Sequence, residues 1–128
     1  MQVGLSPSHL LCLALAFANT PALSQDGNFF LNACAVTVRS ADGVVISPDE
    51  QPLSTFCLGY IAGFMDATSL ASTFKGRRST LCLPESGTSN EQAARLFVKY
   101  LRENPEQLHE SGRMSLYISL SRVFRCKQ

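Results

Sequence analysis

The 128-residue sequence contains too few residues of several kinds to build most types of active site. Of its two histidines, only His109 lies beyond the apolar N-terminal stretch, and the four cysteines beyond that stretch are widely spaced. Nucleophilic catalysis needs a histidine beside a Ser or Cys and a third group that orients it, and a structural zinc site needs clustered Cys and His. The sequence therefore predicts no enzyme, no metal and no cofactor, with His109 at the surface or at an interface.

The sequence also lacks a strong excess of either charge, since 11 Lys and Arg face 10 Asp and Glu. This balance argues against nucleic acid or an anionic membrane as a bulk partner. We find no internal repeat, no low-complexity tract and no apolar run long enough for stable membrane insertion. Two basic patches, one around Arg77 and Arg78 and one in the C-terminal tail, are interpreted as solvated surface.

The first 24 residues carry no Lys, Arg, Asp or Glu and include an apolar run over residues 10–18. This run is too short to cross a bilayer, and small residues follow it at Ala22 and Ser24, which is typical of a secretory signal peptide. The usual basic residue before the run is missing, so a buried N-terminal helix is the alternative. We expect a signal peptide over residues 1–24, cleaved after Ser24, and one small exported domain over residues 25–128.

Hydrophobic periodicity after the leader predicts an all-α fold, a small disulfide-bonded bundle of four main helices. The first helix is expected over residues 28–39 with Asp26 or Asn28 as its N-cap, although its end also suits a strand. The second is expected over residues 53–74. Either of two capping boxes, Thr88 with Glu91 or Ser89 with Gln92, starts the third helix, which stops at Asn104 before Pro105.

The last helix is expected over residues 113–124. Residues with helical spacing define its expected inner face, namely Met114, Tyr117, Leu120, Ser121 and Phe124.

The second helix contains two glycines one turn apart, Gly59 and Gly63, on either side of Tyr60. A glycine inside a helix costs about 1 kcal/mol relative to alanine, so the pair indicates that something approaches the backbone closely. We interpret this small-residue face as packing against a neighbouring helix, with a ligand or partner contact as the alternative. Asp66 is interpreted as a buried or half-buried polar anchor, because it is the acidic residue in an otherwise apolar helix.

Cys34, Cys57, Cys82 and Cys126 form a disulfide frame, which indicates an oxidising compartment. Cys57 lies at the start of the long helix and Cys82 beyond its end, about 25 Å apart at about 1.5 Å per residue. Because bonded cysteines have Cα atoms within about 7 Å, this pair is disfavoured. The favoured pairs are Cys34 with Cys57 and Cys82 with Cys126, each worth about 3 to 4 kcal/mol in the loop-entropy model. The alternative pairing, Cys34 with Cys82 and Cys57 with Cys126, stays open.

Several segments together resemble the Rap/Tai family of type VI secretion amidase-immunity proteins. They are residues 57–67, the Cys82-Leu83-Pro84 turn, residues 97–101 with Asn104-Pro105, and Leu120 leading to Phe124 and Cys126. The resemblance covers nearly all of residues 25–128, and it departs from the family at Arg125, where the family often has proline. It implies an often dimeric periplasmic protein that binds a peptidoglycan amidase effector and occludes its active site, without enzymatic activity of its own.

Inhibition of that kind is favoured by a loop that is already rigid, because little conformational entropy is then lost on binding. The loop over residues 84–90 qualifies, since Cys82 fixes one end and a capped helix fixes the other. We predict that this loop and the basic loop before it supply the partner-binding residues, with a purely structural connection as the alternative. The predicted residues are Glu85, Ser86, Thr88, Ser89, Asn90, Arg77 and Arg78.

A second function class also fits the composition, a periplasmic disulfide-bonded helical chaperone or stress protein. Such a protein exposes apolar surface on acidification, which predicts pH-dependent dye binding and dimer dissociation. An immunity protein is expected to show neither.

Overall fold

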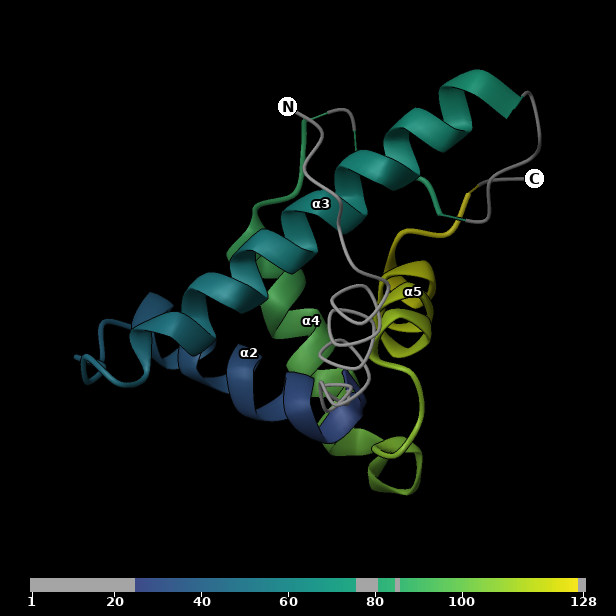
Figure 1. Ribbon diagram of the computed structural model, residues 1–128. Helices are drawn as coiled ribbons and strands as arrows, with labels where there is room; N and C mark the ends of the chain where they lie inside the picture. The colour runs from purple at the N-terminus through teal and green to yellow at the C-terminus, as the bar shows by residue number, and fades with distance from the viewer. Residues whose placement is uncertain (1–24, 76–80, 85, 127–128) are drawn as a thin grey trace, which may run out of the picture.

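The computed structural model describes residues 25–75, 81–84 and 86–126, and the described part of the chain is helical without a strand. The elements are α2 (Gly27–Ala41), α3 (Gln51–Lys75), α4 (Asn90–Glu103), the short 3-10 helix η1 (Pro105–Gln107) and α5 (Gly112–Val123). Figure 1 shows α3 running across the molecule, with α2 and α4 beside its first half and its C-terminal end projecting from the body. The predicted all-α bundle of four main helices is confirmed.

Helix α2 begins at a side-chain cap. The Asp26 carboxylate accepts a hydrogen bond from the Phe29 backbone N–H at 3.0 Å, so Asp26 is the N-cap of the two candidates. Asn28 instead donates its side-chain amide to the Leu108 carbonyl at 3.0 Å, which ties α2 to the segment before α5. The helix continues without a break to Ala41, so the alternative of a strand near its end is wrong.

The core is built around the Phe30 ring, which is fully buried. Its ring centroid lies 4.5 Å from Tyr60, 5.8 Å from Phe56 and 5.5 Å from Phe97, so α2, α3 and α4 all contribute to one aromatic cluster. Burying a phenylalanine side chain stabilises a fold by about 1.5 to 3 kcal/mol. This cluster therefore fixes how α2, α3 and α4 pack together.

The inner face of α5 differs from the predicted one. The residues that α5 buries are Gly112, Ser115, Leu116, Ser119 and Leu120, so of the predicted face only Leu120 is fully inside.

The cause is the close approach of α5 to the core. A Cβ on Gly112 would lie 2.1 Å from the Phe30 ring, so this end of α5 must be small where it faces inward. The buried Ser119 hydroxyl is satisfied within the helix by donating to the Leu116 carbonyl at 2.8 Å. A hydrophobic pattern cannot indicate a face made partly of glycine and serine, and Met114 is left 55% exposed.

Both favoured disulfides are confirmed. The Cys34–Cys57 bond joins α2 to α3 with a Cα–Cα distance of 5.2 Å, and both cysteines are fully buried. The Cys82–Cys126 bond joins the segment before α4 to the end of α5 with a Cα–Cα distance of 4.9 Å. Neither bond joins α2 and α3 to the rest of the described chain, so the two halves are held together by noncovalent contacts, among them the aromatic cluster, the Arg95–Asp42 ion pair and the Gly112 N–H bond to the Gln25 carbonyl.

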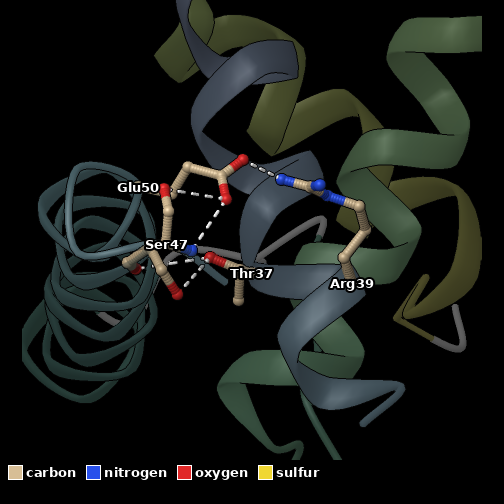
Figure 2. Close-up of polar contacts among 5 residues, drawn as sticks. Thr37, Arg39, Ser47 and Glu50 are labelled. Carbon is tan, nitrogen blue, oxygen red and sulfur yellow. Dashed lines mark hydrogen bonds and ion pairs between the residues drawn. The ribbon is translucent and has the colours of Figure 1, made fainter. Parts of the chain in front are cut away.

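The corner between α2 and α3 is closed by polar contacts, which Figure 2 shows. The buried Thr37 hydroxyl lies 3.1 Å from the Ser54 hydroxyl and 3.3 Å from the Ser54 carbonyl. On the surface, the Glu50 carboxylate accepts from the Ser47 backbone N–H at 3.0 Å and pairs with Arg39. Ser47 and Glu50 thus hold the entry to α3, and Arg39 attaches that entry to α2.

Within the described ranges, no helix is both long enough and apolar enough to cross a membrane. The predicted signal peptide over residues 1–24 lies outside the described residues.

Candidate partner-binding surfaces

The loop before α4 is fixed at both ends, as its sequence predicts. At one end Cys82 is bonded to Cys126, and its backbone N–H donates to the Phe124 carbonyl at 2.8 Å. At the other end the Ser89 hydroxyl accepts from the Gln92 backbone N–H at 3.1 Å, so Ser89 is the N-cap of α4 and Thr88 is not. The ends of this loop are therefore set by covalent and capping contacts.

Between these ends the loop makes a tight turn. The Gly87 N–H donates to the Pro84 carbonyl at 2.9 Å, and Gly87 has a φ of 81°, a conformation that favours glycine. Ser86 and Ser89 are exposed on either side of it. Thr88 is half-buried, and its hydroxyl oxygen is buried without a hydrogen-bond partner in the described part of the chain.

The structure brings four of the predicted partner-binding residues, Ser86, Thr88, Ser89 and Asn90, together along this turn and the start of α4. Glu85, Arg77 and Arg78 lie outside the described residues, so their predicted part in the surface stays a prediction. His109 is exposed and pairs with the neighbouring Glu110 at 3.2 Å. It lies outside the loop and takes no part in this surface.

A second surface lies where α3 and α5 face each other, and there the predicted packing of Gly59 and Gly63 is wrong. Both glycines are exposed, and no atom of the described residues lies within 4 Å of where a Cβ would be. They form the floor of a groove of about 690 Å³, which we call the α3–α5 groove. Its lining residues are Gly59, Tyr60, Gly63, Phe64, Arg113, Met114 and Tyr117.

The walls of the α3–α5 groove are apolar, and its one charged lining residue is Arg113. The pKa of the Tyr60 phenol is raised by burial, and the nearby Arg113 charge opposes that rise. Arg113 is exposed, and the ion pairs found among the described residues do not include it. The guanidinium therefore lies at the rim of an apolar surface and is open to an anionic group.

The interpretation of Asp66 as a buried or half-buried anchor is also wrong, because the residue is exposed. The neighbouring Met65 is buried in the core, so α3 still packs on the body here and Asp66 lies on its solvent-facing side. Sequence analysis missed the roles of Arg113 and Met114 for a related reason. The groove depends on which face α5 turns inward, and that face is set by Gly112 and serines rather than by a hydrophobic stripe.

In the described ranges, no three His, Cys, Asp or Glu side chains gather closely enough to hold a metal ion. The two surfaces differ in chemistry, since one is a hydroxyl-rich turn and the other is an apolar groove with Arg113 among its lining residues.

Comparison with known families gives one match. A family model described as Rap1a immunity proteins matches residues 26–126, which include all four helices and all four disulfide cysteines. No curated protein and no solved structure matches the chain.

Proposed function

We propose, since the chain belongs to the family of Rap1a immunity proteins, that it is a periplasmic inhibitor of a peptidoglycan amidase delivered by type VI secretion. Family membership supports the general role of an immunity protein that binds a secreted effector and acts without enzymatic activity. The nature of the effector as an amidase, the periplasmic location and the occlusion of its active site are our proposal.

The observation that carries this proposal is the loop over residues 84–90 with both ends fixed. Its disulfide and its N-cap hold the ends, and the Pro84–Gly87 turn shapes the tip. A preformed loop loses less conformational entropy on association than a flexible loop does. Such a loop can enter the concave site of an enzyme and exclude its substrate.

The chemistry of the tip supports the same role. Ser86 and Ser89 are small, exposed and uncharged, so they enter a narrow cleft without the large desolvation cost of a charged group. Their hydroxyls can donate to and accept from polar groups lining that cleft. The predicted contribution of Glu85, Arg77 and Arg78 is to flank this contact.

The disulfides and the family also support the proposed compartment. Two disulfides, together with membership of an immunity family, suggest a secreted or periplasmic protein. A cleaved signal peptide over residues 1–24 is the proposed route of export, and a homodimer is the proposed assembly.

The test changes a residue at the tip of the loop and leaves Ser89, the N-cap of α4, unchanged. Because Ser89 caps α4, a bulky residue there would destabilise the helix and confuse the result, so Ser86→Trp is the informative change. We expect Ser86→Trp to abolish protection of cells that express an amidase effector from the same genome, and to weaken binding of the purified effector by at least tenfold. The control is Val45→Trp, a substitution at a side chain that is 94% exposed on the α2–α3 loop.

Unchanged protection by Ser86→Trp would refute the loop assignment. A wild-type protein that neither binds nor inhibits any amidase effector of that genome would refute the amidase proposal itself.

The alternative function, a disulfide-bonded periplasmic chaperone, is favoured by one observation, the apolar α3–α5 groove with Met114 55% exposed. It requires apolar exposure to increase on acidification. Fluorescence of an apolar dye, followed from pH 7 downward, separates the two functions, because an immunity protein is expected to bind the dye without a step in pH.

A further inference from the structure

Along the α3–α5 groove, two consecutive turns of α3 carry a glycine that none of the described residues covers. Gly59 and Gly63 lie one turn apart and face the same way, and each gives up helix stability relative to alanine. In the described residues nothing packs on them within 4 Å of the Cβ position. The backbone of α3 is thus open to close approach from outside the monomer.

The shape of the α3–α5 groove favours a protein segment over a small molecule. Its volume of about 690 Å³ would suit either, but a small-molecule site buries most of its ligand, about 70 to 90%. Here the floor glycines are exposed and Met114, on the opposite wall, is 55% exposed. An open trough of this kind matches the way a helix or extended segment lies in a groove.

The charge of the groove describes the segment further. Arg113 is the charged residue among the lining residues, and the ion pairs of the described residues leave it without an acidic partner. Guanidinium groups pair with carboxylates through paired hydrogen bonds. The complementary surface is therefore an apolar stretch that places an Asp or Glu at the Arg113 end.

A second copy of this chain fits that description poorly. A two-fold contact centred on the groove would set the same patch against itself. The partner's patch would then have to supply the carboxylate for Arg113, and the groove lining contains no acidic residue. A charge covered at an interface without a partner disfavours association.

We propose that the α3–α5 groove is a second docking surface for the effector, occupied by an apolar segment whose carboxylate pairs with Arg113. This inference rests on the proposed function, in that the occupant is a part of the inhibited effector. It adds a contact distinct from the loop over residues 84–90. The loop blocks the active site of the effector, and the groove binds a segment of the effector that lies outside that active site.

The first test uses two synthetic helical peptides of Leu and Ala, identical except for one central Glu or Gln, and titrates them into the purified disulfide-bonded protein. We expect the Glu peptide to bind about two- to fivefold more tightly, the range of an exposed ion pair. Arg113→Gln should remove that difference, and Gly63→Leu should weaken both peptides at least tenfold by filling the trough. Arg102→Gln and Ser69→Leu, exposed positions on α4 and α3 outside the lining, should change neither.

Equal affinity for the two peptides, no binding of either, or equal losses in Gly63→Leu and Ser69→Leu would overturn the proposal. Sedimentation of the same variants supplies a further check, because a dimer that Gly63→Leu converts to monomer would assign the groove to a second copy instead.

The second test uses the amidase effector and separates this inference from the proposed function. If the wild-type protein binds the effector and Gly63→Leu weakens that binding at least tenfold while Ser69→Leu does not, the groove is part of the interface. If effector binding is lost in Ser86→Trp but unchanged in Gly63→Leu and Arg113→Gln, the proposed function holds and the groove proposal fails. If the wild type binds no effector, the proposed function fails together with this occupant.

Discussion

Replacing the two exposed glycines of α3 by alanine should make the monomer more stable. Gly59 and Gly63 lie inside a 25-residue helix, and the described residues leave room for a methyl group at both. Alanine in an exposed helix interior gains about 0.8 to 1 kcal/mol over glycine, partly by restricting the unfolded chain. Each substitution should therefore raise the free energy of unfolding by nearly 1 kcal/mol, which corresponds to a Tm increase of about 4 to 8 °C for a domain near 100 residues.

Two other helical glycines of the same chain provide matched controls. A Cβ on Gly112 would lie 2.1 Å from the Phe30 ring and 2.8 Å from the Gln25 carbonyl oxygen, and one on Gly27 would lie 2.9 Å from the Leu108 carbonyl oxygen. Overpacking of this kind typically costs about 1 to 3 kcal/mol. Gly112→Ala and Gly27→Ala should therefore lower stability, so the same chemical change has opposite signs at the two pairs of positions.

The measurement is urea-induced unfolding followed by circular dichroism, with both disulfides intact and at a protein concentration where sedimentation shows a monomer. Destabilisation by Gly59→Ala or Gly63→Ala under those conditions would refute the conclusion that this face is open. Stabilisation combined with weaker effector binding would show that the chain gives up helix stability to keep the groove.

Three further predictions concern the two disulfides, Glu50 at the start of α3 and the N-cap of α4. Mild reduction should open Cys82–Cys126 before Cys34–Cys57, because Cys82 is exposed whereas Cys34 and Cys57 are fully buried. Mass spectrometry of alkylated protein gives the order of reduction, and the reverse order would contradict the burial argument. The pKa of the Glu50 carboxyl is lowered from its ordinary value, chiefly by the Ser47 backbone N–H and then by Arg39, so its contribution to stability is complete above the ordinary glutamate pKa and is lost as the pH falls through the folded-state pKa. Glu50→Gln should accordingly lower the urea midpoint at pH 7 and flatten its acid-side dependence, and parallel pH curves for the two proteins would count against this account. Ser89→Ala should cost about 1 kcal/mol in urea unfolding through loss of the α4 cap, whereas an unchanged midpoint would mean that the cap does not stabilise α4.

The existence and type of the helices could be predicted from the sequence because each carries a local signal. Ser89 with Gln92 started α4, Pro105 stopped it, and the stripe of α3 was continuous. The length of α3 disfavoured one of the three possible disulfide pairings, because it separates Cys57 from Cys82, and the structure decides between the other two. These features depend on residues near one another along the chain.

The surfaces were harder to predict because they depend on how the helices pack. Gly59 and Gly63 were expected beneath a neighbouring helix, yet the inward turn of α5 leaves them open. That turn brings Gly112 against the Phe30 ring and its N–H onto the Gln25 carbonyl, long-range contacts that no periodicity records. Asp66 was expected to be at least half-buried because its neighbours in α3 are apolar, but Met65 faces the core and Asp66 lies on the exposed side of the helix.

The order of the two sulfur bridges along the chain bears on how the protein matures. Cys34 bonds to the next cysteine in the described chain, Cys57, and Cys82 bonds to the next after it, Cys126, so the two closed segments neither overlap nor interlock. If the chain is exported as proposed, each of these cysteines can join the one that emerges directly after it. An oxidase that pairs thiols in order of arrival would then make this pattern directly, without a disulfide isomerase.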